Sequence, residues 1–178
     1  MRPPFRFDPA ADPAMPLLIV LLLLMSAANG GTVHLVTTGS GDEIPVTLFP
    51  AAGEDLLVWL PHEFGATPRR DALTRELANQ GIEVWMPDLH AAWFLPTGRY
   101  SLNDVDPAAI AAILADAITG TGKRVFLVAE GRSVALALNG VRRWQMDTED
   151  TSGLAGLLAF SPRLYLRTPQ GGEAAEYL

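Results

Sequence analysis

The chain has 178 residues, with 13 Lys and Arg against 20 Asp and Glu, which gives a net charge of −7. With 49% hydrophobic and 19% charged residues it has the composition of one folded domain, so disorder over its whole length is excluded. The acidic balance, without any run of basic residues, argues against nucleic acid as a partner. The absence of Cys excludes disulfides and thiolate zinc sites, and the three His (His34, His62, His90) are too scattered to suggest a metal cluster.

The first 30 residues differ from the rest. Arg2 and Arg6 precede an unbroken apolar run at 17–25, which small residues follow. This run is too short for a bilayer core that needs ~20 residues, but it fits the apolar segment of ~7–15 residues in a secretory signal. We interpret 1–30 as a signal peptide, in which Ser26 and Ala28 would occupy the −3 and −1 positions if cleavage follows Ala28. This predicts an exported protein, periplasmic or secreted, with membrane contact only through this segment. The alternative is a disordered or membrane-associated N-terminal extension.

Residues 31–178 alternate between short apolar runs and amphipathic stretches. Two β-rich segments, 32–38 and 44–48, predict an opening hairpin at a sheet edge, because Pro45 removes a ladder donor. Further strands are predicted at 56–60, 82–86, 125–129 and 154–160, with helices that begin at Pro68, Pro107 and Ser133 and end near Gly81, Gly120 and Arg143. Strands alternating with helices form βαβ units, so we expect an α/β fold: a three-layer sandwich whose sheet is mostly parallel with an antiparallel N-terminal hairpin.

The segment 125–138 places Ser133 at the junction of a buried strand and a helix. Gly131 and Ala135 lie two residues to either side, and only small residues avoid a collision at so sharp a turn. The pattern resembles the nucleophile elbow of the α/β-hydrolase family, G-x-S-x-G, with Ala135 replacing the second Gly. The alternative is a serine that merely caps the helix.

Two other segments agree with this resemblance. Residues 60–65 look like the family's H-G oxyanion loop, with Glu63 where Gly is usual, and residues 84–90 resemble the family segment P-D-L-x-G-H-G without its glycines. The resemblance runs from about Thr32 to Phe160. It implies an α/β-hydrolase-like domain at 31–178 that is incomplete.

The resemblance also implies a chemistry, which is acyl transfer at an ester-like bond of a small-molecule substrate, without a cofactor or metal. Ser133 would be the nucleophile, and the backbone N–H groups of Val134 and Phe64 would stabilise the oxyanion. A carboxylate at Glu63 would oppose that oxyanion unless its side chain turns away.

The general base is the missing part. The family orders its triad as Ser, then Asp or Glu, then His, yet all three His precede Ser133. The chain is then the front portion of a longer hydrolase, a catalytically inactive binding or scaffold domain, or an enzyme in which His34, His62 or His90 acts from an unusual position.

Two further expectations concern surfaces. The long loop at 87–103 carries Trp93, Phe94 and Tyr100, which either line a substrate pocket or simply pack the loop. A sheet that ends at residues 154–160 leaves an unpaired edge, which predicts marginal stability or self-association.

Overall fold

A computed structural model describes residues 31–165, 170–174 and 176–177 of the protein. The signal-peptide interpretation concerns residues 1–30 and lies outside the described residues. Within the described part, no helix is both long and apolar enough to cross a membrane.

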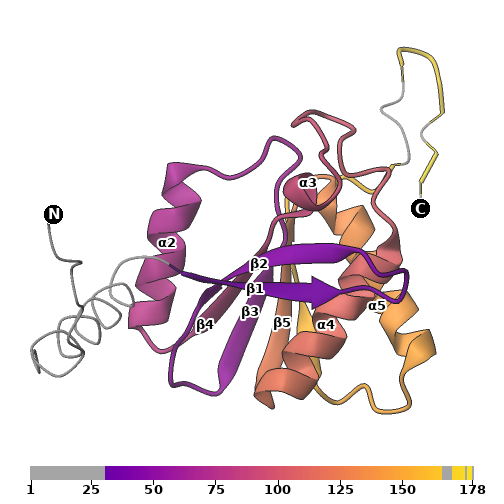
Figure 1. Ribbon diagram of the computed structural model, residues 1–178. Coiled ribbons are helices and arrows are strands. Elements are labelled where there is room, and N and C mark those ends of the chain that lie inside the picture. The colour runs from indigo at the N-terminus through magenta and orange to yellow at the C-terminus, as the bar shows by residue number, and fades with distance from the viewer. Residues whose placement is uncertain (1–30, 166–169, 175, 178) are drawn as a thin grey trace, which may run out of the picture. The chain divides into compact units, whose positions relative to one another are not determined.

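The described elements follow one another in the predicted order, with one addition: a short helix, α3, lies within the segment 87–103 that the sequence predicts to be a loop (Figure 1). They are β1 (Thr32–Thr37), β2 (Glu43–Phe49), β3 (Asp55–Trp59), α2 (Pro68–Asn79), β4 (Glu83–Pro87), α3 (Leu89–Ala92), α4 (Pro107–Thr121), β5 (Arg124–Glu130), α5 (Ser133–Asp147) and β6 (Leu154–Phe160). The six-stranded sheet has the order β1-β2-β4-β3-β5-β6. β1, β2 and β4 pair antiparallel, whereas β4, β3, β5 and β6 run parallel. The expected mixed α/β sheet with an antiparallel start is confirmed.

The opening hairpin lies at one edge of the sheet, as Pro45 predicts, but β2 itself pairs on both sides. Its pairing with β4 begins at Val46, opposite Pro87. The Pro45 carbonyl still accepts from the Asp88 N–H at 2.8 Å. Because proline has no N–H, Pro45 cannot donate a second hydrogen bond to β4, and the β2–β4 ladder ends at this single bond.

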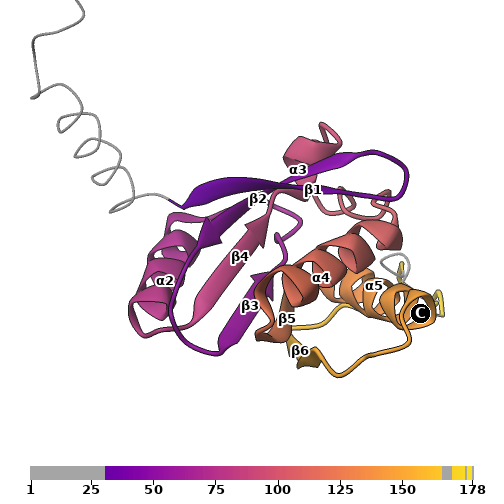
Figure 2. The same cartoon turned by 60° about the horizontal axis from the view of Figure 1, so that its bottom comes forward.

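The helices form the two outer layers. α4 and α5 lie together on one face of the sheet, and α2 lies on the other (Figure 1, Figure 2). α2 contacts β4 through Thr74, whose buried hydroxyl lies 3.3 Å from the Met86 sulfur. A Cβ at Gly140 of α5 would collide with Ile110 of α4, so this glycine lets the two helices approach closely.

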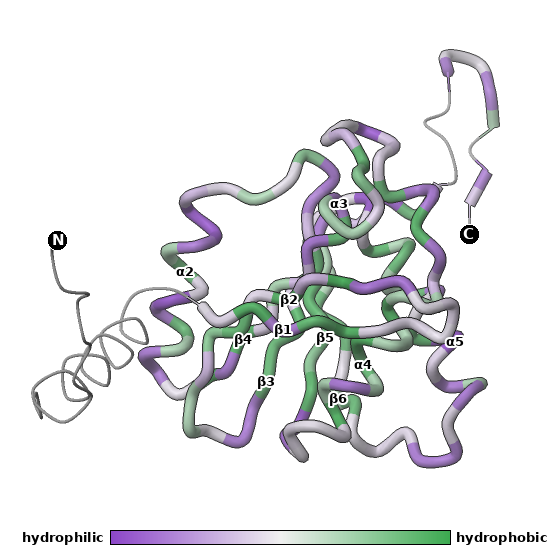
Figure 3. Tube along the Cα trace, viewed as in Figure 1, coloured by the Kyte–Doolittle hydropathy of each residue, from purple (hydrophilic) through white to green (hydrophobic). Residues whose placement is uncertain are grey.

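The core lies between the sheet and the α4–α5 layer. Apolar segments are concentrated in the strands and in α4 (Figure 3). β3 and β5 contribute Leu56, Val58, Val125, Leu127 and Ala129, Leu60 follows β3 directly, and α4 contributes Ile110, Ile113 and Leu114. Successive side chains of a strand point to opposite faces of the sheet. The buried positions of β3 and β5 named above therefore face α4 and α5, and the residues between them face the α2 side.

The predicted helix starts are confirmed at α2 and α4. Thr67 accepts from the Arg70 N–H at 3.3 Å and Asp106 accepts from the Ala108 N–H at 2.8 Å. α4 runs slightly past the predicted end at Gly120 and stops at Gly122, whose φ of +64° is the left-handed conformation that favours glycine at a helix end.

β6 is the edge strand opposite the hairpin among the described residues. Its pairing with β5 places Leu158 and Phe160 on the α2 side of the sheet, beyond the reach of α2. These two side chains are 45% and 54% exposed. At this edge, where the sequence predicts an unpaired strand, the described structure therefore exposes two large apolar side chains.

Candidate functional site

The sharp turn between β5 and α5 has Gly131 at its apex. Its φ is +62°, in the left-handed region, and α5 begins only two residues later. The Gly131 N–H donates to the Phe160 carbonyl at 3.0 Å, and the Arg163 N–H donates to the Gly131 carbonyl at 2.9 Å. The last residue of β6 and the segment just after it therefore hold both sides of the apex residue in place.

Ser133 lies after the turn, as the first residue of α5, and its side chain is fully buried. Its hydroxyl donates to the Glu130 carbonyl at 2.8 Å and lies 3.0 Å from the Glu130 N–H, which donates back to it. The bend occurs at Gly131, and the Ser133 hydroxyl stays in the interior, whereas the nucleophile of an elbow is exposed. The alternative of a capping serine does not describe it either, since Arg132 is the N-cap and makes no side-chain cap bond.

The elbow pattern fits the sequence in a second register that sequence reasoning missed. Residues 129–133 read Ala-Glu-Gly-Arg-Ser, with a small residue two positions to each side of Gly131. The centre of a nucleophile elbow has a strained backbone conformation. Gly131 accepts a positive φ without steric penalty, so a glycine between a strand and a helix was the signal that could have placed the apex.

The carboxylate of Glu63 fills the space beside this apex. Glu63 is 1% exposed, and a Cβ built on Gly131 would lie only 2.9 Å from its Oε2 atom. Oε2 also lies 3.3 Å from His62 Nε2 and accepts from the Arg132 N–H at 3.5 Å. Oε1 lies 3.5 Å from an Arg163 guanidinium nitrogen. The side chain turns toward the elbow, which is the unfavourable arrangement for an oxyanion there.

The loop that carries Glu63 is held rigidly. The Glu63 carbonyl accepts from the Gly98 N–H at 2.8 Å and from the Ser101 hydroxyl at 3.0 Å. The Gly65 N–H donates to the His62 carbonyl at 2.8 Å, and Gly65 has a φ of +84°. These bonds fix the direction from which the carboxylate approaches the apex.

The two predicted oxyanion donors do not converge on an exposed serine hydroxyl. The Phe64 N–H donates to His62 Nδ1 at 3.2 Å, and the Phe64 ring is 59% exposed. Val134 is buried in the first turn of α5. The N–H that follows the apex belongs to Arg132, and it faces Glu63. His62 and Phe64 instead line a hollow of about 470 Å³ on the α2 side.

The predicted aromatic cluster is spread over different environments. Trp93 packs against the core, and Phe94 is 94% exposed. Tyr100 places its ring against the guanidinium of Arg132, 4.7 Å from the ring centroid. The three side chains therefore do not form one pocket, and loop packing describes Trp93 best.

The other histidines have hydrogen-bond partners other than Ser133. His34 Nε2 lies 2.7 Å from an Asp116 oxygen, and His90 Nε2 lies 3.1 Å from the Ser101 hydroxyl. Only the Glu130 backbone is a hydrogen-bond partner of the Ser133 hydroxyl in the described structure. Within the described residues, no group of three or more His, Asp and Glu is arranged to hold a metal ion.

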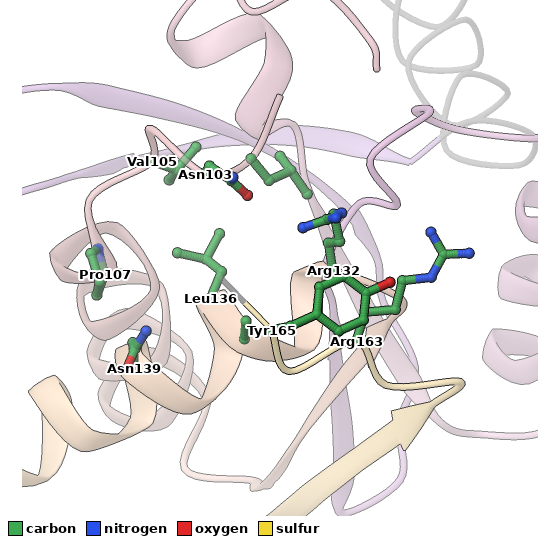
Figure 4. A pocket seen from close by; sticks show the side chains of 10 residues that line it. Asn103, Val105, Pro107, Arg132, Leu136, Asn139, Arg163 and Tyr165 are labelled. Carbon is green, nitrogen blue, oxygen red and sulfur yellow. The ribbon is translucent and has the colours of Figure 1, made fainter. Parts of the chain in front are cut away.

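A cavity of about 250 Å³ opens beside the turn, at the carboxyl end of β5 (Figure 4). Its walls come from the loop before α4, the first half of α5 and the segment after β6. The lining residues are Leu102, Asn103, Val105, Pro107, Arg132, Ala135, Leu136, Asn139, Arg163 and Tyr165. Such a position, outside the carboxyl ends of the strands, is where α/β sheets commonly bind ligands.

No protein-family model and no curated protein matches the sequence. Among solved structures, the chain is similar to DcsB in complex with its substrate analogue (TM-score 0.58, 13% identity, 76% of this chain and 47% of that chain). It is also similar to the alpha/beta hydrolase GrgF from Penicillium sp. sh18 (TM-score 0.51, 18% identity, 75% and 46%). A third similar structure is an esterase from Pyrococcus furiosus (TM-score 0.52, 12% identity, 79% and 53%). The chain spans about half the length of these proteins, and its described residues have the α/β-hydrolase-like fold.

Proposed function

We propose that this chain is a ligand-binding domain built on the α/β-hydrolase fold, without serine-dependent acyl transfer. One observation carries the proposal. Gly131 occupies the apex of the turn between β5 and α5, while the Ser133 hydroxyl, two residues further on, is fully buried and bonded to the strand end.

The neighbourhood of the apex supports the same conclusion. An acyl-transfer site needs an exposed nucleophile and N–H groups directed at the developing oxyanion, where each donor contributes about 2.7–4 kcal/mol. Here the Arg132 N–H that follows the apex faces the Glu63 carboxylate. A negative charge that is already buried at this position disfavours a second one beside it.

The competing function is an esterase-type hydrolase in which Ser133 is the nucleophile. It is favoured by the names of similar solved structures, which include a lipase/esterase from Lactobacillus plantarum and the esterase from Pyrococcus furiosus. That function requires the Ser133 hydroxyl to leave both hydrogen bonds to Glu130, each worth about 0.5–1.5 kcal/mol net, and to emerge from the interior.

A fluorophosphonate probe separates the two functions, because it reacts with activated serine hydroxyls. The full chain and its Ser133→Ala variant are incubated with the probe beside an active serine hydrolase as a positive control, and intact masses are measured. We expect neither form to gain the probe mass. Labelling of the unaltered chain that disappears in Ser133→Ala would overturn the proposal and establish the esterase-type function.

We also propose that the protein is exported, on the strength of the apolar run at 17–25 and the preceding arginines. Expression of the full gene followed by cell fractionation and mass measurement tests this. Accumulation of full-length chain in the cytoplasm would refute it.

A further inference from the structure

We propose that the hollow on the α2 side binds an aromatic carboxylic acid, with its carboxylate at Arg69 and Arg70 and its ring against Phe64. This hollow shares no lining residue with the cavity beside the turn. The inference names the ligand class of the proposed binding function and rests on that function only for the absence of turnover.

The hollow lies where the loop after β3 meets the first half of α2. Its lining comes from the segment 59–73 and from Glu130, the last residue of β5. It therefore lies at the carboxyl ends of two parallel strands, where α/β sheets commonly bind ligands. Its volume of about 470 Å³ falls within the range of roughly 300–1,000 Å³ that is typical of ligand pockets.

The charge of the hollow favours an anion. Its lining includes Arg69 and Arg70 and one carboxylate, that of Glu130, so with His62 neutral the lining carries a net charge of 2 − 1 = +1. The whole chain has a net charge of −7, so this region contrasts with the rest. Arg69 and Glu130 are exposed. Water screens the repulsion between an anion and the exposed Glu130 carboxylate.

Arg70 is the stronger anchor for an anion because it is half-buried. Its Nη1 atom donates to the Leu60 carbonyl at 3.3 Å, and its Nε atom is buried without a hydrogen-bond partner among the described residues. Burial lowers the pKa of Arg70, since it takes the charged guanidinium out of water, while the charges of Asp71, Glu130 and Asp88 act in the opposite direction. A carboxylate beside this guanidinium offsets the electrostatic cost of its burial.

The remaining lining favours an aromatic ring. The Phe64 side chain is 59% exposed, and its ring stacks on His62 with the centroids 5.5 Å apart and an angle of 27° between the planes. Trp59 and Leu73 add further apolar surface. Offset stacking of aromatic rings is favourable beyond the area that they bury. A one- or two-ring aromatic acid uses both the arginines and this surface, whereas an inorganic anion uses only the arginines.

Titration of the isotope-labelled full chain, followed by amide chemical shifts in NMR spectra, tests the inference with three probes: naphthylacetate, naphthylethanol and acetate. We expect saturable binding of naphthylacetate that is about 10-fold tighter or more than binding of the other two, because each of these lacks one of the recognised groups. Equal binding of naphthylethanol would show that the hollow is only apolar, and equal binding of acetate would show an unselective anion site. Either result, or no saturable binding of naphthylacetate, overturns the proposal.

One set of variants locates the carboxylate. Arg70→Gln should weaken naphthylacetate binding about 10-fold, whereas Arg75→Gln, at an exposed position of the same helix outside the lining, should leave it unchanged. If Arg70→Gln does not fold, Arg69→Glu reverses an exposed charge of the lining and should weaken binding similarly. Unchanged affinity in a folded variant of either lining arginine refutes the location.

A second pair of variants locates the ring. Phe64→Ala should weaken naphthylacetate binding about 5-fold or more, because it removes the stacking partner and its apolar surface. Phe94→Ala should leave the affinity unchanged, since Phe94 is 94% exposed and lies outside the lining. Equal affinities of these two variants would contradict the placement of the ring against Phe64.

The two proposals fail separately. Naphthylacetate binding together with fluorophosphonate labelling would overturn the non-catalytic function and leave the acid site standing. Absence of both would overturn the acid site alone.

Discussion

Substitution of Gly131 by alanine tests whether the Glu63 carboxylate fills the apex of the turn. Two costs are expected. A non-glycine residue at a φ of +62° costs about 1–2 kcal/mol. The new Cβ would also lie 2.9 Å from Glu63 Oε2, so a buried carboxylate must shift. We assign this displacement about 1 kcal/mol, which makes the total about 2–3 kcal/mol.

Gly122 provides a matched control for the first cost. Its φ is +64°, nearly that of Gly131, but a Cβ there meets nothing within 4 Å. Gly122→Ala should therefore lose only the conformational part, about 1–2 kcal/mol. The difference between the two variants isolates the contact with Glu63.

Urea unfolding of the two variants, followed by circular dichroism, measures both costs. In a Glu63→Ala background the excess cost of Gly131→Ala should disappear, which a double-mutant cycle shows as coupling of about 1 kcal/mol. Equal losses for Gly131→Ala and Gly122→Ala, with no coupling to Glu63, would refute the idea that the carboxylate occupies the apex.

Three other predictions concern the buried serine, the helix interface and the open sheet edge. Ser133→Ala removes both side-chain bonds to the end of β5 and should cost about 1–3 kcal/mol in urea unfolding; a neutral effect would mean that the hydroxyl is not buried there. Gly140→Ala should destabilise by about 1–3 kcal/mol because its Cβ collides with Ile110, although alanine is the better helix former; a gain in stability contradicts the close contact. We propose self-association at the β6 edge: light scattering should show a mass that rises with concentration and falls in a Leu158→Lys, Phe160→Lys variant, whereas a strictly monomeric chain opposes this.

Much of the fold could be predicted from local pattern. The uninterrupted apolar runs that became β3 and β5 are typical of strands covered on both faces. Thr67-Pro68 and Asp106-Pro107 mark helix starts because the polar side chain accepts a free N–H and proline needs none. The exchange of β3 and β4 in the strand order is set by tertiary packing, and no local residue pattern encodes it.

The site was harder to predict because two elbow registers overlap. Small residues recur at 129, 131, 133 and 135. The sequence pattern alone therefore fits an elbow centred on either Gly131 or Ser133. The backbone decides between them, since only Gly131 has a positive φ. The inward turn of Glu63 depends on His62, Arg132 and Arg163, which come from three segments that meet only in the fold.

The most direct test of the buried serine uses the fact that the chain has no cysteine. Ser133→Cys replaces the hydroxyl by the sole thiol of the protein, and Ser152→Cys puts the thiol at an exposed position as a control. Reaction with a disulfide reagent is followed in the native state. We predict that the S152C variant reacts at once, while the S133C variant reacts only as fast as the protein opens. Equally fast reaction of both variants would contradict the account.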